Sequence, residues 1–90
     1  RKGHRLLVGF AAETENLRQE ALRKLKSKNC DMMVANLVGR PGAGFESEDN
    51  AATLVTASGD VVDLPRSSKR ELAARIFDQI RKLAAARTPR

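Results

Sequence analysis

Residues 6–36 read LLVGFAAETENLRQEALRKLKSKNCDMMVAN, and this stretch decides the fold class. It contains two short apolar runs, at 5–10 and 31–36, with a helix-like pattern between them. Apolar runs of this length are typical of strands that are buried on both faces of a sheet. Two such strands joined by a helix require parallel pairing and a right-handed crossover. The stretch therefore predicts a βαβ unit of an α/β protein.

The helix between the two runs has sequence signals at both ends. Asn16 and Gln19 have the spacing of a capping box, which predicts Asn16 as the N-cap. The pattern continues to about Lys28, and Asn29 is suited to end the helix in the left-handed conformation. The helix is thus expected to fill most of the interval between the two strands.

Polar residues gather where the first strand gives way to the helix. Ligands of open parallel α/β sheets bind just outside the carboxyl ends of the strands. Residues 9–16, and Asn36 at the end of the second run, are therefore the expected place of a functional site.

Two lysines interrupt the apolar face of this helix. With Leu17 at zero and 100° per residue, Lys28 lies at about 20° and Lys24 at about −20°, within and at the border of the apolar arc that includes Ala21, Leu22 and Leu25. Long lysine side chains can reach water from an apolar edge, which is a purely structural explanation. The functional alternative is a cleft where two ammonium groups one turn apart bind an anion such as a triphosphate. The pattern alone leaves both interpretations open.

The second half of the chain predicts a loop followed by a hairpin. Residues 37–50 are rich in glycine and acidic side chains and form a long irregular loop. Strands at 51–57 and 61–64 flank a turn at Ser58-Gly59-Asp60, and Pro65 is expected to stop the pairing.

A second helix begins at the capping box Ser68-Lys69-Arg70-Glu71 and runs to about Ala86. Its expected apolar face must cover the sheet, because it would otherwise be exposed to water. That face comprises Leu72, Ile76, Phe77, Ile80, Leu83 and Ala84.

Composition bounds the size and class of the protein. The 90 residues form one domain, with an ordinary 41% of hydrophobic and 31% of charged residues. No apolar run approaches the roughly 20 residues of a membrane helix, and nothing resembles a signal peptide. The single Cys30 excludes an internal disulfide and fits a reducing cytoplasm. The first residue is Arg1 rather than Met, which favours a fragment.

A net charge of +6 predicts an anionic partner, which nucleic acid, nucleotides or phosphorylated metabolites could all be. The chain has no Trp or Tyr, and its three Phe are dispersed, which argues against a base-stacking platform. It has neither helix-turn-helix nor zinc-finger spacing. A small basic module that binds nucleic acid or an acidic protein remains the alternative class.

Several chemically reactive side chains also have purely structural explanations. Cys30 would need a neighbouring base to act as a nucleophile, and nothing in the sequence brings His4 to it, so a buried structural thiol is favoured. The acidic side chains within 46–49 could hold Mg²⁺, although a solvated loop is favoured. The role of Glu13 is left open, because the start of a helix favours a carboxylate whether or not it has a function.

The string Val8-Gly9-Phe10-Ala11-Ala12-Glu13-Thr14, then Lys24 with Lys28, then Cys30-Asp31 leading to Val34-Ala35-Asn36, resembles the phosphopantothenate–cysteine ligase family. So does Gly44-Phe45-Glu46-Ser47-Glu48-Asp49-Asn50, followed by the hairpin and the Ser68-Lys69 helix start. The resemblance spans essentially the whole chain, with the motifs in the family's order.

The resemblance implies a Rossmann-like three-layer α/β/α fold that works as a cytoplasmic homodimer. It implies a ligase that uses CTP with Mg²⁺ to activate 4′-phosphopantothenate as an acyl-cytidylate. The amine of cysteine then displaces CMP, in a step of coenzyme A synthesis. In many bacteria the ligase is fused behind a decarboxylase that carries FMN, which this chain does not contain. Neither nucleic acid nor a membrane is an expected partner.

The resemblance also assigns site residues. Phe10, Lys24 and Lys28 match the family's nucleotide-contacting positions, and Asn36 is a further expected liner of that site. Phe45 and Asn50 match a family signature to which the sequence gives no role.

The family's ligase domain is considerably longer than this chain. Its glycine-rich first loop, the asparagine associated with the acyl-cytidylate and its lysine-rich strap have no counterpart here. Residues 1–90 therefore resemble the C-terminal portion of the domain, with a parallel βαβ unit, a β-hairpin and a C-terminal helix. We expect this portion to supply one wall of the CTP site, to hold no catalytic residue and to be inactive alone.

Overall fold

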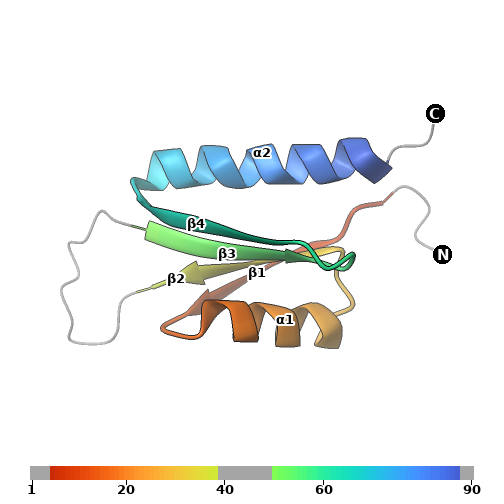
Figure 1. The fold of residues 1–90 in the computed structure, drawn as a ribbon, viewed down its shortest axis with the longest axis horizontal. Coiled ribbons are helices and arrows are strands. Elements are labelled where there is room, and N and C mark those ends of the chain that lie inside the picture. Colours follow the sequence, from red (N-terminus) through yellow and green to blue (C-terminus); the bar gives the residue numbers. More distant parts are fainter. Residues whose placement is uncertain (1–4, 39–49, 88–90) are drawn as a thin grey trace.

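The computed structural model describes residues 5–38 and 50–87 and has three layers, with a four-stranded sheet between two helices (Figure 1). The strands lie in the sheet in the order β1-β2-β3-β4, with β1 and β2 parallel and the other pairs antiparallel. The α/β class, the three layers and the βαβ unit are thus confirmed. The elements are β1 (Val8–Glu13), α1 (Leu17–Ser27), β2 (Met32–Leu37), β3 (Asn50–Thr56), β4 (Val61–Ser67) and α2 (Lys69–Arg87).

Helix α1 covers one face of the sheet, because its apolar side chains meet the inward residues of β1, β2 and β3. Ala21 and Leu25 are buried as predicted, and Leu17 packs partly against the same core. Leu22, which the predicted arc included, is 36% exposed, so the buried stripe is narrower than expected. The buried cluster on this side consists of Ala21, Leu25, Cys30, Met33, Ala35 and Val55.

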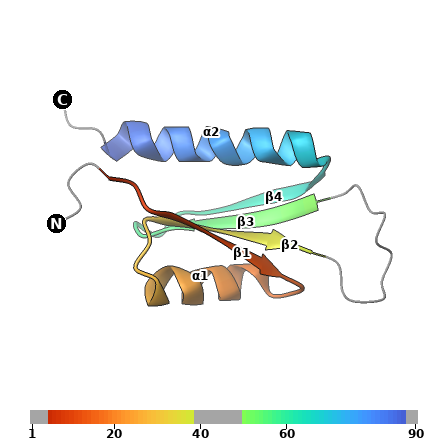
Figure 2. The same cartoon turned by 180° about the vertical axis from the view of Figure 1, so that it is seen from behind.

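Helix α2 covers the other face, but it lies mainly over β3 and β4 (Figures 1 and 2). Leu72 is buried, and three further apolar residues of the predicted face pack against the core from α2: Ile76, Ile80 and Leu83. Phe77 was wrongly placed in that face, since it is 63% exposed. Figure 2 shows β1 at the front edge of the sheet with α2 above it. In the described residues, α2 packs against β3 and β4 more than against β1, where Val8 is partly buried and Phe10 is largely exposed.

The first strand lies further along the chain than the predicted range of 5–10. Residues Val8–Glu13 of β1 pair in register with Met32–Leu37 of β2. Pairing with β2 holds Ala11 and Ala12 in the strand although alanine has little intrinsic preference for one. Phe10 consequently lies in the middle of β1 and not at its end, which corrects the prediction.

The two helix starts differ from each other. Asn16 is the N-cap of α1, as predicted, but it has φ 56° and ψ 47° and its side chain makes no capping hydrogen bond. The predicted capping box was wrong here, because the short connection from β1 turns through the left-handed region, which Asn tolerates. At α2 the Oγ of Ser68 accepts a hydrogen bond from the Glu71 N–H at 3.1 Å, as a Ser N-cap should. Asn29, with φ 53°, follows α1 in the predicted left-handed conformation.

The hairpin forms as predicted, with Gly59 in its turn at φ 105°. Strand β4 nevertheless continues past Pro65 to Ser67, so the expected stop at Pro65 was wrong. Pro65 is tolerated because β4 is an edge strand and its pairing with β3 is irregular between Asn50 and Ala52. Neither described helix is long and apolar enough to span a membrane.

Candidate functional site

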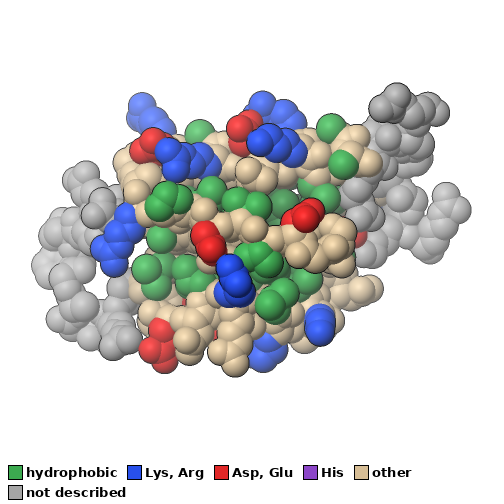
Figure 3. All heavy atoms as spheres, viewed as in Figure 1, with side chains coloured by type: hydrophobic (Ala, Val, Ile, Leu, Met, Phe, Trp, Pro, Cys, Tyr) green, Lys and Arg blue, Asp and Glu red, His purple; other side chains and the backbone are tan. Residues whose placement is uncertain are grey.

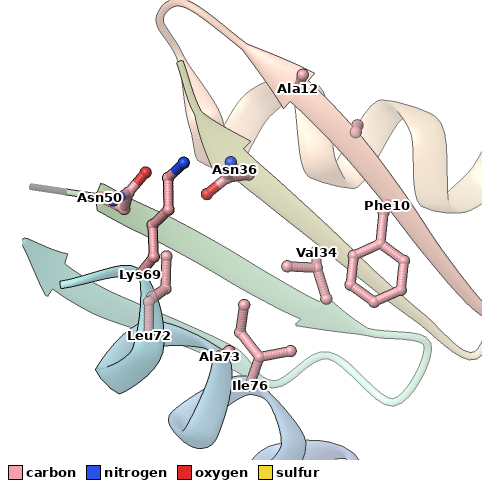
Figure 4. A pocket seen from close by; sticks show the side chains of 10 residues that line it. Phe10, Ala12, Val34, Asn36, Asn50, Lys69, Leu72, Ala73 and Ile76 are labelled. Carbon is pink, nitrogen blue, oxygen red and sulfur yellow. The ribbon is translucent and has the colours of Figure 1, made fainter. Parts of the chain in front are cut away.

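A groove of about 510 Å³ lies beside α2, along β1 and the carboxyl end of β2 (Figure 4). On this side of the sheet Val34 is fully buried, whereas Phe10 is largely exposed. The groove is lined by Phe10, Ala11, Ala12, Val34, Asn36, Asn50, Lys69, Leu72, Ala73 and Ile76.

One half of the groove is apolar. The ring of Phe10 projects from β1 toward Val34 and Ile76 (Figure 4). Phe10 is 66% exposed, although large apolar side chains are usually buried. An exposed aromatic ring beside apolar neighbours can pack against a planar group such as a nucleobase.

The other half is polar and lies at the carboxyl ends of β1 and β2. Asn36 comes from the end of β2, Asn50 from the start of β3, and Lys69 is the first residue of α2. Figure 4 shows the Lys69 ammonium group between the two asparagine side chains. None of the lining residues within 5–38 and 50–87 is Asp or Glu, so this described part of the groove presents a positive charge and amide groups. Such an end suits a polar anion.

Lys24 lies on the other side of the sheet, at the same end. Its Nζ is 2.5 Å from Oε2 of Glu13, the last residue of β1. The two side chains are only 26% and 14% exposed, so this ion pair is partly shielded from water. Glu13, whose role the sequence left open, thus forms an ion pair with Lys24 at the carboxyl end of β1.

Lys28 is the exposed C-cap residue of α1. Because α1 runs back toward the amino ends of the strands, Lys28 lies about one turn, roughly 6 Å, further from the carboxyl ends than Lys24. Of the four predicted site residues, the structure brings together Phe10 and Asn36 in the groove. It places Lys24 behind the same end of the sheet and leaves Lys28 apart.

Sequence reasoning did not assign Asn50 or Lys69 to the site. Lys69 was noted only as part of a capping box, yet a cation in the first turn of a helix opposes the helix dipole. That unfavourable placement is the signal that could have marked Lys69 as a functional candidate.

The remaining candidates from the sequence are Cys30, a metal ion site, His4 and the acidic side chains within 46–49. Cys30 is 7% exposed within the α1-side core, as expected of a structural thiol. Residues 5–38 and 50–87 contain no group of three His, Cys, Asp or Glu side chains that could hold a metal ion. His4 and the acidic side chains within 46–49 lie outside the described residues.

Basic side chains do not form a continuous patch on the face drawn in Figure 3. There Lys and Arg are spread over the surface, with Asp and Glu between them. Two α2 arginines have acidic neighbours on their own helix: Arg75 with Glu71, and Arg81 with Asp78. This arrangement gives no support to a nucleic-acid-binding surface on that face.

Comparisons with known proteins agree with one another. A family model described as the DNA/pantothenate metabolism flavoprotein C-terminal domain matches residues 1–83. The chain is 39% identical over 84 residues to the coenzyme A biosynthesis bifunctional protein CoaBC of Bacillus subtilis, covering 93% of this chain and 21% of that protein. It is 42% identical over 80 residues to a cysteine/cysteine sulfinic acid decarboxylase of an unknown prokaryotic organism, covering 89% of this chain and 22% of that protein.

A solved structure is also similar. It is the crystal structure of the C-terminal domain of the coenzyme A biosynthesis bifunctional protein CoaBC, with a TM-score of 0.68 and 36% identity. The similarity covers 91% of this chain and 36% of that one. The chain spans about a fifth of the length of the curated relatives that it matches.

Proposed function

The chain belongs to the DNA/pantothenate metabolism flavoprotein C-terminal domain family, and on that premise we propose that it is part of a CTP-dependent ligase of coenzyme A biosynthesis. The ligase joins 4′-phosphopantothenate to L-cysteine through an acyl-cytidylate. The observation that carries the proposal is the similarity, over 91% of this chain, to the solved C-terminal domain of CoaBC.

In this proposal the groove and the carboxyl end of β1 form one wall of the nucleotide site. Phe10 packs against the base, and Asn36 offers amide hydrogen bonds beside it. Both line the groove, whose volume of about 510 Å³ is within the range of small-molecule sites.

Lys24 and Lys28 contribute positive charge to the same site. When the carboxylate of 4′-phosphopantothenate attacks the α-phosphorus of CTP, pyrophosphate leaves with additional negative charge. An ammonium group near the departing oxygens stabilises that charge. The ammonium group of Lys24 has three N–H donors, so it can keep Glu13 as a partner and still donate a hydrogen bond to a phosphate. Lys28 is assigned to the site by the resemblance alone, since it lies at the C-terminal end of α1, apart from the groove.

The described residues do not supply a Mg²⁺ site of their own. Mg²⁺ commonly binds phosphate oxygens with only one or two carboxylates, so we derive no step through a metal held by this chain. FMN belongs to the fused decarboxylase of the family and has no role here. We further propose that the complete ligase is a cytoplasmic homodimer and that neither nucleic acid nor a membrane is its partner.

The chain offers a matched pair of variants for testing the nucleotide site. Phe10 and Phe77 are exposed to similar extents, 66% and 63%, but only Phe10 lines the groove. We expect Phe10→Ala to weaken CTP binding by about tenfold, the effect of losing one base–aromatic stack. Phe77→Ala should leave binding unchanged. The measurement is a titration of the ¹⁵N-labelled chain with CTP, followed by nuclear magnetic resonance.

ATP, and duplex DNA across a salt series, complete the experiment. Preference for CTP over ATP at constant salt supports the proposal. Binding that shows no CTP preference, follows DNA and falls steeply with salt would identify the nucleic-acid module instead. Equal effects of the two phenylalanine variants would contradict the assignment of the groove.

A further inference from the structure

The polar end of the groove brings together side chains from three elements. Asn36 in β2 pairs with Ala52 in β3, and Asn50 lies two residues before Ala52. Side chains two residues apart in a strand point to the same face, so both asparagine side chains face α2. Lys69 reaches the same place from the start of α2 (Figure 4).

Lys69 forms no ion pair with any residue in 5–38 or 50–87. The acidic side chain in the first turn of α2, Glu71, pairs with Arg75 instead: Oε2 of Glu71 is 3.1 Å from Nη2 of Arg75. Among the residues that the structure describes, Lys69 is the only charged side chain that lines the groove. The helix dipole adds further positive potential there. Within the described residues, Lys69 is therefore an exposed cation without an ion-pair partner.

The remaining groove residues indicate the shape of a ligand. Phe10 lies at the apolar end, and Ala12, with its small side chain, lies along the same strand on the side of Asn36 (Figure 4). A molecule with an apolar or planar part at Phe10 and a phosphate at Lys69 would satisfy both ends. Amide groups such as those of Asn36 and Asn50 can donate hydrogen bonds to phosphate oxygens.

We propose that Lys69, flanked by Asn36 and Asn50, binds a phosphate group of the ligase's substrates. This inference rests on the proposed function and extends it, because Lys69 and Asn50 are not among the residues assigned to the nucleotide site above. Two substrates carry such a group: the triphosphate of CTP and the phosphate of 4′-phosphopantothenate.

The test compares Lys69→Gln with Arg70→Gln in the full 90-residue chain. Both substitutions remove one positive charge from the first turn of α2, but only Lys69 lines the groove. The probes are inorganic pyrophosphate, CTP and 4′-phosphopantothenate, titrated at constant ionic strength. Thermal unfolding of each variant establishes that it is folded.

We expect Lys69→Gln to weaken binding by about tenfold, as loss of one charged hydrogen bond would, and Arg70→Gln to have little effect. Weakening for CTP and pyrophosphate alone assigns the site to the nucleotide. Weakening for 4′-phosphopantothenate alone assigns it to the acid substrate. Asn50→Asp, which supplies a carboxylate beside Lys69, should weaken the same probe.

Equal losses in the two Gln variants would overturn the inference, since general electrostatics would then account for the binding. So would unchanged binding in Lys69→Gln, or no binding of any probe by the unaltered chain. If CTP binding depends on Phe10 but not on Lys69, this inference alone fails and the proposed function stands. If CTP does not bind while 4′-phosphopantothenate binds through Lys69, the nucleotide site fails instead.

Discussion

At the residue scale, the ion pair between Lys24 and Glu13 explains why a lysine is tolerated at the border of the apolar face of α1. Its ammonium group is held by a carboxylate at the carboxyl end of β1, with the two side chains 26% and 14% exposed. Helical geometry could single out Lys24 from the sequence. It could not identify Glu13 as the partner, because that contact depends on how α1 packs against β1.

We expect Glu13→Gln to lower the free energy of unfolding by about 1 kcal/mol, since the pair is only partly exposed. Lys24→Gln should cost a similar amount. Urea denaturation of both single variants and the double variant measures the coupling. If the pair is real, the double variant loses less stability than the two single losses combined. Strict additivity would show that the two side chains do not interact in solution.

At the scale of elements, hydrophobic periodicity predicted both helices, the βαβ unit and the hairpin. It failed where backbone pairing overrides local preference. Strand β1 extends through Ala11 and Ala12 because β2 pairs with them, and β4 continues past Pro65 at the edge of the sheet. Asn16 and Ser68 both have the sequence of an N-cap, but only Ser68 caps its helix, because the connection before α1 requires a left-handed residue.

The two helix starts should respond differently to substitution. Ser68→Ala removes the acceptor of the Glu71 N–H and should destabilise the chain by about 1 kcal/mol. Asn16→Ser supplies a good capping residue but places it in the left-handed region, so we expect a loss of about 1 kcal/mol there as well. Asn16→Gly should be neutral or better. Thermal or urea unfolding measures all three, and a neutral Asn16→Ser would restore the capping-box interpretation.

At the scale of the whole molecule, the sequence predicted the layers but not the groove. The groove lies where α2, which packs mainly over β3 and β4, passes β1 and the carboxyl end of β2. The periodicity of α2 shows which of its sides is apolar, whereas its lateral position depends on tertiary packing. For the same reason the sequence overestimated the burial of Phe77 and gave Lys69 only a capping role.

A chain that spans about a fifth of its curated relatives is expected to lack ligase turnover on its own. We expect it to restore turnover when it replaces the 84 matched residues of the Bacillus subtilis relative. Release of pyrophosphate from CTP, dependent on 4′-phosphopantothenate, measures both. The same chimaera with Phe10→Ala should be impaired, and one with Phe77→Ala should not. Turnover by the isolated chain, or an inactive but folded chimaera, would contradict the expectation.

The strand order of the sheet has a consequence for how the chain acquires its structure. Every strand neighbours the strand that precedes it in the chain, from β1 to β4. During synthesis each new strand therefore meets an edge that has already been made, and no strand has to insert between two others. Contacts between neighbours in the chain need only short loop closures, which favours rapid folding. We expect the sheet to assemble in chain order as the polypeptide leaves the ribosome, with α2 closing over β3 and β4 last.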